Sequence, residues 1–296
     1  MQRNFATLDV FTERRFAGNP LAVVLEAEGL DSTAMQAIAR EFGHPETVFA
    51  LARENREHRA RVRIFTPLRE LPFAGHPTVG TAVLFGLRDG SAAGHPLVLH
   101  ENIGPVHCSF ESGAGGRGRA SFKIPQLPAP AGAAAEDAAI AAALSLDPAD
   151  IGFGNLRPAR WSAGIPFTFV PVAGVTAVAR CRPDPARFGA VFGDEAVYVL
   201  CGDSVDAGHD FHARMFAPAL GVAEDPATGS AAAAFAGFHA AAGGLADGEH
   251  AVAIEQGYEM GRPSLIRLTL TIDAGNLVSA SIGGSAVVVT EGRIEA

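Results

Sequence analysis

Along the whole chain, hydrophobic residues alternate with polar ones, or β-branched residues follow one another, in short runs. Runs of this kind are typical of strands, and they outnumber the patterns that predict helices. Strands are predicted at residues 21–25, 47–52, 60–65, 96–100, 196–200, 265–272 and 286–290. The chain is therefore expected to be rich in β-structure.

Helical patterns are found in four segments. Residues 31–42 have Asp31 or Ser32 as a candidate N-cap and Gly43 as a stop signal. The other predicted helices cover residues 78–87, the alanine-rich stretch 134–144, and residues 228–242. The segment 127–132 is rich in Pro, Ala and Gly, lacks a pattern, and is the best candidate for a linker.

The sequence contains an internal repeat. RIFTP at residues 63–67 is followed after eight residues by HPTVGTA at 76–82, and RMFAP at 214–218 is followed after six by DPATGSA at 225–231. Both copies read as a strand, a turn and a helix of small residues. Because the Arg, Phe, Pro, Gly and hydroxyl positions agree together, the repeat predicts two copies of one α/β unit.

Small residues open both repeated helices. Gly75, Gly229 and Ser230 leave the first backbone N–H groups uncovered, and the helix dipole adds partial positive charge there. Two such helix ends facing each other would bind a carboxylate or an enolate-like oxyanion without a metal. The alternative is that the small residues only allow the two helices to pack closely inside their sheets.

Equivalent positions of the two turns carry His76 and Asp225, which can both transfer protons. His76 lies at a helix entrance, although a single histidine is more often a core residue bonded to a carbonyl. Asp225 precedes Pro226 and is also consistent with an ordinary N-cap. The active site is expected at residues 75–77 and 224–226.

Glu46 is a third candidate, because it follows the end of a predicted helix and precedes a predicted strand. A glutamate in this position is usually solvated, and a role as general base would require partial burial. A phosphate-binding loop is a competing interpretation of residues 75–81, but the lysine expected after Gly80 is absent. A nucleoside triphosphatase is therefore not expected.

The charge balance excludes some partners. The 296 residues include 23 basic and 32 acidic ones, for a net charge of −9, whereas nucleic-acid binding needs clustered Lys and Arg. Neither a signal peptide nor a long apolar stretch is found, so we expect a cytoplasmic protein without a membrane span. Cys108, Cys181 and Cys201 are expected to be buried, inert thiols. No motif implies a metal or an organic cofactor.

Several segments together resemble the phenazine biosynthesis PhzF-like family, within the diaminopimelate epimerase superfamily. The matching segments are DVF at 9–11, FAGNPLAV at 16–23, ETVF at 46–49, RIFTP at 63–67, FAGHPTVG at 73–80, EDPATGSA at 224–231, and QG at 256–257 with MGRPS at 260–264. The resemblance implies an α/β (α+β) fold of two similar domains, each a curled mixed sheet wrapped around a central helix. The expected domains are residues 1–127 plus 284–296, and residues 128–283, with the active site in the cleft between them. A homodimer is also implied.

The same resemblance implies cofactor-free proton transfer, such as the isomerisation of a dihydro-hydroxyanthranilate. Glu46 matches the catalytic glutamate, which takes a proton from one carbon and returns it to another, and His76 and Asp225 match its polar partners. The expected substrate-binding residues are Asn19, Gly75, Thr228, Gly229 and Ser230. In the epimerases of the superfamily, the positions of His76 and Asp225 are cysteines, so a two-thiol racemase is excluded.

We therefore expect a metal- and cofactor-free isomerase that acts on a small anionic substrate, either cyclic or amino-acid-like. One alternative is a small-molecule binding or regulatory protein that keeps the site without turnover. Another is a lyase or dehydratase, because proton abstraction next to a leaving group leads to elimination. The intact set of Glu46, His76 and Asp225 favours turnover over binding alone.

Overall fold

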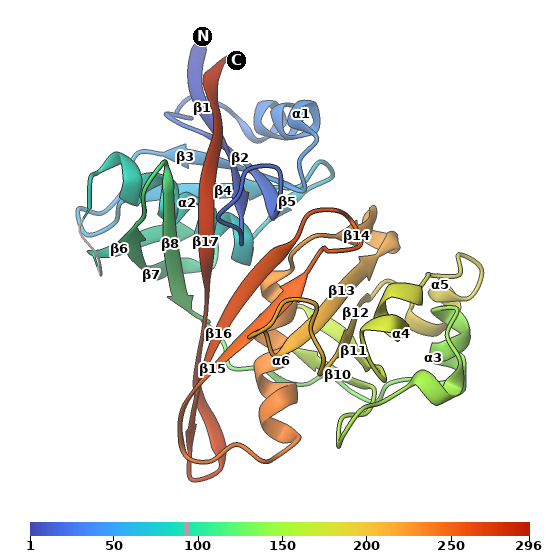
Figure 1. The fold of residues 1–296 in the computed structure, drawn as a ribbon. Helices are drawn as coiled ribbons and strands as arrows, with labels where there is room; N and C mark the ends of the chain where they lie inside the picture. Colours follow the sequence, from blue (N-terminus) through green and yellow to red (C-terminus); the bar gives the residue numbers. More distant parts are fainter. Residues whose placement is uncertain (92–94) are drawn as a thin grey trace. The chain divides into compact units, whose positions relative to one another are not determined.

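Two units make up the chain in the computed structural model, which describes residues 1–91 and 95–296 (Figure 1). The first unit combines Met1–Lys123 with Gly283–Ala296, and the second unit is Ile124–Ile282. Among the described residues, every helix is too short or too polar to cross a membrane.

The first unit consists of a curled sheet with one helix inside it and one outside. Its strands are β1 (Gln2–Val10), β2 (Asn19–Val24), β3 (Glu46–Leu51), β4 (Ala60–Phe65), β5 (Glu70–Leu71), β6 (His95–Glu101), β7 (Gly104–Ser112), β8 (Arg117–Lys123) and the C-terminal part of β17 (Asn276–Glu295). Its helices are α1 (Ser32–Phe42) and α2 (Gly75–Arg88). α1 packs on β3 and β4 through Met35, Ile38 and Ala39.

The sheet of the first unit closes on itself around α2. β1 pairs with β2 and β17, β2 is parallel to β3, β4 is parallel to β6, and β8 returns to β17. All residues of α2 up to Gly86 are buried, as expected for a helix surrounded by strands. Gly80 allows the close approach, because a Cβ there would lie 2.5 Å from Leu21 Cδ2 and 2.7 Å from Val10 Cγ2.

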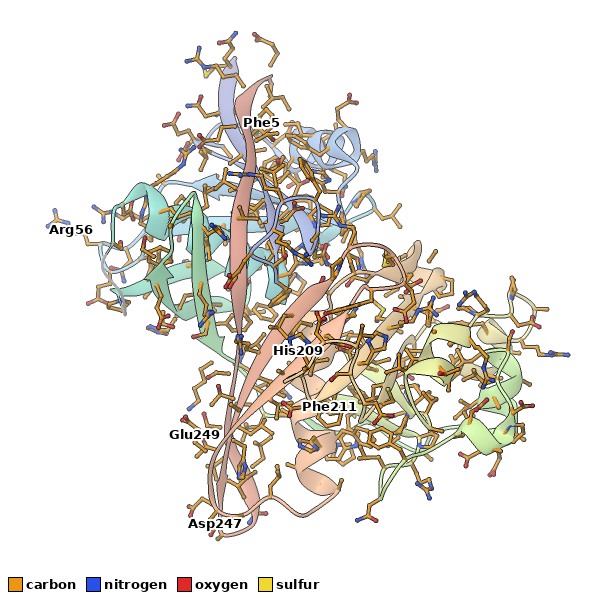
Figure 2. All side chains as sticks on the ribbon, in the orientation of Figure 1. Phe5, Arg56, His209, Phe211, Asp247 and Glu249 are labelled. Carbon is orange, nitrogen blue, oxygen red and sulfur yellow. The ribbon has the colours of Figure 1, made fainter. Side chains whose placement is uncertain are left out.

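The second unit has its own sheet and central helix. Its strands are β9 (Ala129–Pro130), β10 (Ala159–Ser162), β11 (Pro166–Pro171), β12 (Ala196–Cys201), β13 (Phe211–Ala217), β14 (Val222–Asp225), β15 (Gly248–Gln256), β16 (Ser264–Asp273) and the N-terminal part of β17. Its helices are α3 (Asp137–Ala143), α4 (Val175–Arg180), α5 (Phe188–Phe192) and α6 (Gly229–Ala241). α6 packs against β9, β10, β11 and β16. Phe211, labelled in Figure 2, meets Phe235 of α6 edge to face, with ring centroids 4.9 Å apart.

The two units share one order of strand pairing, which confirms the predicted repeat. In the first unit β2 is parallel to β3, β3 is antiparallel to β4, and β4 is parallel to β6, with α2 in the connection. In the second unit β11, β12, β13 and β15 pair in the same way, with α6 in the connection. The expectation of two similar domains, each with a central helix, is confirmed.

The repeated arginines make the same contact in both units. Arg63 donates through Nε and Nη2 to the two carboxylate oxygens of Glu70, at 2.7 and 2.6 Å. Arg214 donates in the same way to Glu224, at 2.8 and 2.9 Å. Because Glu70 and Glu224 precede α2 and α6, each bidentate pair ties a central strand to the segment that enters the central helix.

The ends of α1 agree with the prediction, because the residues that cap this helix are adjacent to it in the sequence. Asp31 accepts a hydrogen bond from the Ala34 N–H at 2.8 Å, and Gly43 ends α1 with φ 63°, as predicted. α2 begins at Gly75, three residues before the predicted start, because Pro77 is accommodated in the first helical turn, where an N–H is not required.

Strand β17 is much longer than the predicted strand at 286–290. It spans Asn276–Glu295, and its second half pairs antiparallel with β1 over the whole length of β1, from Gln2 opposite Glu295 to Val10 opposite Ala286. The two ends of the chain therefore lie side by side (Figure 1). The polar residues on the exposed face of this strand hid it from a hydrophobic pattern.

Candidate active site

Glu46 lies where helix α1 has ended and strand β3 begins. Gly43 adopts a left-handed conformation, which favours glycine, and the chain then enters β3 beside Leu21 of the parallel strand β2. The Glu46 side chain remains 17% exposed. Its carboxylate is therefore partly buried and still accessible, which is the combination that a general base requires.

His76 is the second residue of α2 and lies close to Glu46. Its Nε2 is 3.4 Å from Glu46 Oε2, and the residue is buried. The pKa of His76 is lowered to about 3, mainly by burial; a hydrogen bond to the Pro20 backbone opposes this shift and the nearby His44 adds to it. His76 is therefore a neutral imidazole at physiological pH.

The tautomer of His76 follows from its partners. Because Pro20 offers only a carbonyl, the ring nitrogen bonded to it must carry a proton. Nε2 makes no hydrogen bond with any residue that the structure describes, so Nδ1 is the donor. Nε2 then carries the lone pair and faces Glu46 as an acceptor.

Asn19 and Gly75 are the predicted substrate-binding residues of the first unit. Asn19 is fully buried at the start of β2 and directly precedes Pro20, the acceptor for His76. Gly75 is the first residue of α2 and directly precedes His76. Helix geometry leaves the Gly75 N–H without an intrahelical partner. The first unit thus brings these predicted residues together at the N-terminal end of α2.

Glu101 is a second acidic group next to this helix end, and the sequence did not identify it. It is 1% exposed at the end of β6, and Oε1 lies 2.6 Å from Thr78 Oγ1. Burial raises the pKa of Glu101 to about 8, and the hydrogen bond with Thr78 opposes this only in part. Thr78 Oγ1 also lies 2.8 Å from the Ala74 carbonyl. Since a threonine hydroxyl has one proton, both contacts are satisfied when Glu101 is protonated and donates to Thr78.

Asp225 ends strand β14 of the second unit and is buried. Thr228 Oγ1 donates to Asp225 Oδ2 at 2.7 Å. The interpretation of Asp225 as an N-cap is wrong, because α6 begins at Gly229 and Thr228 occupies the N-cap position. The first N–H groups of α6 belong to Gly229 and Ser230, where helix geometry provides no intrahelical acceptor. The predicted residues of the second unit are thus contiguous at the N-terminal end of α6.

Gln256 supports the turn that carries Asp225, and sequence reasoning gave it no role. It is fully buried at the end of β15, and its Nε2 lies 2.8 Å from the Asp225 carbonyl oxygen. The sequence contains only a weak signal for this role, a polar residue at the end of an apolar strand, directly before Gly257.

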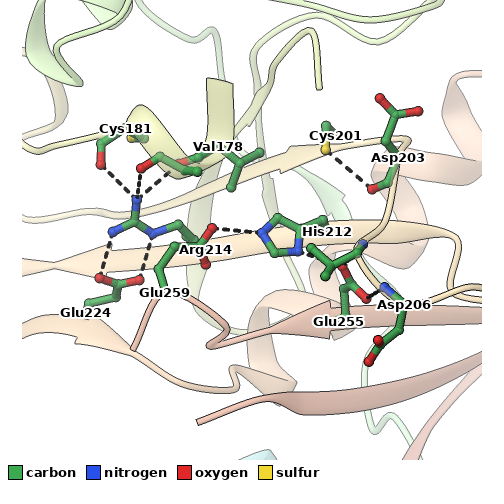
Figure 3. Close-up of polar contacts among 12 residues, drawn as sticks. Val178, Cys181, Cys201, Asp203, Asp206, His212, Arg214, Glu224, Glu255 and Glu259 are labelled. Carbon is green, nitrogen blue, oxygen red and sulfur yellow. Dashed lines mark hydrogen bonds and ion pairs between the residues drawn. The ribbon is translucent and has the colours of Figure 1, made fainter. Parts of the chain in front are cut away.

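Arg214 and His212 are two buried basic side chains of β13, and each contacts glutamates (Figure 3). Arg214 binds Glu224, the residue before Asp225, so Glu224 is a structural partner of this arginine. His212 lies between Glu255 and Glu259, with Nδ1 2.7 Å and Nε2 2.9 Å from their carboxylates. Burial lowers the pKa of His212, but these two acidic neighbours outweigh it and the net shift is upward. His212 is therefore charged over a wider pH range than an ordinary histidine.

One group of potential metal ligands occurs among the described residues. Ligand atoms of Asp206, His209 and Glu255 lie within 4.8 Å of one another. These atoms already have protein partners: His209 Nδ1 is 2.7 Å from Glu255 Oε2, and Tyr258 donates to Asp206 Oδ2 at 2.5 Å. The group is explained by hydrogen bonding between the loop before β13 and the C-terminal end of β15 with the residues that follow it.

The three cysteines are buried, as predicted. Burial raises the pKa of Cys181 to about 12 and that of Cys201 to about 11, and it raises the pKa of Cys108 still further. Because the thiolate is the reactive form, these residues are poor candidates for nucleophiles at neutral pH.

Comparison with known proteins gives consistent matches over the whole chain. The family model for phenazine biosynthesis-like proteins (PhzC-PhzF) matches residues 8–292. A protein of Mesorhizobium japonicum named as an uncharacterized isomerase is 49% identical, over 99% of this chain and 98% of its own. The trans-2,3-dihydro-3-hydroxyanthranilate isomerase of Pseudomonas chlororaphis is 34% identical, over 98% and 99%. The crystal structure of a PhzF-family phenazine biosynthesis protein of Bacillus anthracis superimposes with a TM-score of 0.90 at 27% identity, covering both chains completely.

Proposed function

Because this chain belongs to the phenazine biosynthesis-like (PhzC-PhzF) family, we propose that it is an isomerase that moves a proton on a small carboxylate substrate. The relative from Pseudomonas chlororaphis is named for an isomerase of trans-2,3-dihydro-3-hydroxyanthranilate. We propose a substrate of that kind, a cyclic or amino-acid-like carboxylate, with Glu46 as the group that carries the proton.

The single observation that carries this proposal is the pairing of Glu46 with a neutral His76. Glu46 Oε2 lies 3.4 Å from His76 Nε2, and the lowered pKa of His76 keeps that nitrogen unprotonated. When Glu46 removes a proton from a substrate carbon, the new carboxyl O–H has an acceptor within reach. The same carboxyl group can then deliver the proton to a second carbon.

We propose that the N–H groups of Gly75, Gly229 and Ser230 bind the substrate carboxylate or the charge that develops on it. N-terminal ends of helices attract anions through uncovered N–H groups and the helix dipole. Asp225 and Asn19 would position the substrate. Asp225 would also exchange protons with the polar groups of the substrate. This scheme uses protein groups alone for proton transfer.

Deuterium exchange tests the assignment of Glu46. The wild-type protein, incubated in D₂O with trans-2,3-dihydro-3-hydroxyanthranilate and with amino-acid-like carboxylates, should introduce deuterium into at least one of them. Glu46→Gln should lower the rate by about 10² to 10⁴-fold, the usual contribution of a general base. Glu41→Gln is the matched control, because Glu41 is exposed on α1 five positions away. Equal exchange by wild type and Glu46→Gln would disprove the role of Glu46.

Ligand-induced stabilisation and the mass of the product, measured on the same proteins, separate the alternative functions. A binding protein without turnover would be stabilised by a carboxylate ligand in both wild type and Glu46→Gln, with no exchange in either. A lyase or dehydratase would form a product that has lost the mass of water. An isomerase leaves the mass unchanged apart from deuterium.

A further inference from the structure

The Gln256 side chain makes four hydrogen bonds at the turn that carries Asp225. Nε2 donates to the Asp225 carbonyl at 2.8 Å and to Thr228 Oγ1 at 3.0 Å. Oε1 accepts from the Thr228 backbone N–H at 3.2 Å and from the Tyr198 hydroxyl at 3.1 Å. Both ends of this fully buried amide are therefore satisfied, and three of the four bonds go to the segment 225–228.

The orientation of the amide follows from the chemistry of its partners. The Thr228 backbone N–H can only donate, so the Gln256 atom facing it must be the oxygen. The Asp225 carbonyl can only accept, so the atom facing it must be the nitrogen. Exchanging the two ends of the amide would disrupt both contacts.

This orientation sets the direction of the Thr228 hydroxyl. Thr228 Oγ1 accepts a hydrogen bond from Gln256 Nε2 and has one hydroxyl proton to donate. That proton points to Asp225 Oδ2, 2.7 Å away. Gln256 thus fixes the Asp225 backbone directly and the Asp225 carboxylate through Thr228.

The backbone next to Gln256 also lies against this turn. Gly257 has φ +79°, and a Cβ at this position would lie 2.6 Å from the Pro226 carbonyl oxygen and 2.5 Å from that of Arg262. Only a residue without a side chain allows the end of β15 to approach the Pro226 backbone, directly after Asp225, this closely.

We propose that Gln256 is a positioning residue that holds the Asp225 carboxylate in its reactive orientation. This inference rests on the proposed function, because it assumes that Asp225 contacts the substrate. Gln256 itself is enclosed by protein atoms and acts through Asp225 and Thr228. A displacement of about 1 Å at a reacting group can reduce a rate about 100-fold, so loss of this anchor should affect kcat more than KM.

The test is Gln256→Glu, a substitution of nearly equal shape whose effect depends on pH. An ionised carboxylate has no proton to donate to the Asp225 carbonyl or to Thr228, whereas the protonated form regains one donor. We expect kcat at pH 8 to fall by at least about tenfold, with partial recovery toward pH 5 relative to wild type. Gln36→Glu is the matched control, because Gln36 donates at 2.8 Å to the Thr66 carbonyl in the other unit. Its pH profile should match that of wild type.

A second pair of variants covers the case in which Gln256→Glu does not fold. Thr228→Val removes the hydroxyl that connects Gln256 to the Asp225 carboxylate, and Thr228→Ser restores it. We expect kcat to fall with valine and to recover with serine. Equal kcat for both variants, or a pH profile for Gln256→Glu that parallels wild type, would overturn the proposal.

Hydrogen exchange of the Thr228 amide provides a readout without activity. The bond from this N–H to Gln256 Oε1 predicts faster exchange in Gln256→Leu, which lacks the acceptor, than in the control Gln36→Leu. If the wild-type protein isomerises none of the carboxylates, the proposed function fails, while faster exchange still supports the anchor. Unchanged exchange overturns the anchor even if the enzyme is active.

Discussion

Replacing Glu101 by glutamine should remove a strong pH dependence from the stability of the first unit. Burial raises the pKa of this carboxyl from 4.5 to about 8 in the folded protein. Between these two values the folded state binds more protons than the unfolded state, so stability falls as the pH rises through the window. Below pH 4.5 both states are protonated, and above pH 8 the folded protein bears the full cost of a buried charge.

The magnitude follows from the size of the shift. One pKa unit corresponds to about 1.36 kcal/mol, so between pH 5 and pH 9 this group should lower the free energy of unfolding by about 4 kcal/mol. Glutamine has no charge to bury, and its amide can donate to Thr78 as the protonated acid does. Glu101→Gln should therefore match wild type near pH 5 and be more stable by about 4 kcal/mol at pH 9.

The assay is hydrogen exchange of α2 at several pH values, because this helix lies at the centre of the first unit. Trp161 fluorescence during urea unfolding follows the second unit separately. Glu111→Gln is the matched control, since Glu111 is exposed on β7 of the same unit. Parallel pH dependences for wild type and Glu101→Gln would refute the reasoning, and a shift of equal size in Glu111→Gln would show that the effect is not specific to burial.

Three further predictions concern single side chains. His76 should give NMR ring signals that stay at their neutral positions down to about pH 4, because its pKa is lowered to about 3; ordinary titration near pH 6.5 would contradict its burial as a neutral ring. Gly80→Ala should destabilise the first unit by about 1 to 3 kcal/mol through overpacking, because the new Cβ would lie 2.5 Å from Leu21, and Gly189→Ala, with open space around it, should be neutral or slightly stabilising; urea titrations followed by far-UV circular dichroism check both. Arg214→Met should lower the free energy of unfolding by about 3 to 5 kcal/mol, because it leaves the partly buried Glu224 without its partner. Arg180→Met is the control, because Arg180 is more exposed and its loss should cost about 0 to 1 kcal/mol. Equal losses for the two variants would contradict the importance of burial.

Local signals explain how much of the fold could be predicted from the sequence. Asp31 and Gly43 act within one helical turn, so the sequence alone locates the ends of α1. The repeated Arg-x-Phe-x-Pro segments indicated two related units, because each copy of the repeat is a short continuous segment that can be recognised in the sequence. β17 was predicted at only a quarter of its length, because its pairing partner β1 lies at the opposite end of the sequence.

Candidate site residues could be proposed from the sequence where a side chain that can transfer protons lies within a recognisable motif. Glu46 and His76 were found separately, and only the fold shows that their side chains meet, because β2 and β3 pair beside the start of α2. Gln256 and Glu101 could not be identified, since each owes its role to a partner more than twenty residues away in the chain. A buried polar side chain gives little signal in a sequence until the groups that it satisfies are known.

The antiparallel pairing of β1 with β17 suggests how the order of segments could be rearranged. Residues 1 and 296 exchange two backbone contacts, at 2.6 and 2.9 Å, so a short flexible linker would span them. A circular permutant that joins these ends and opens between Lys123 and Ile124 would make each unit continuous in sequence. The chain would then pass from one unit to the other once instead of twice, and the second unit could be completed before the first unit is made.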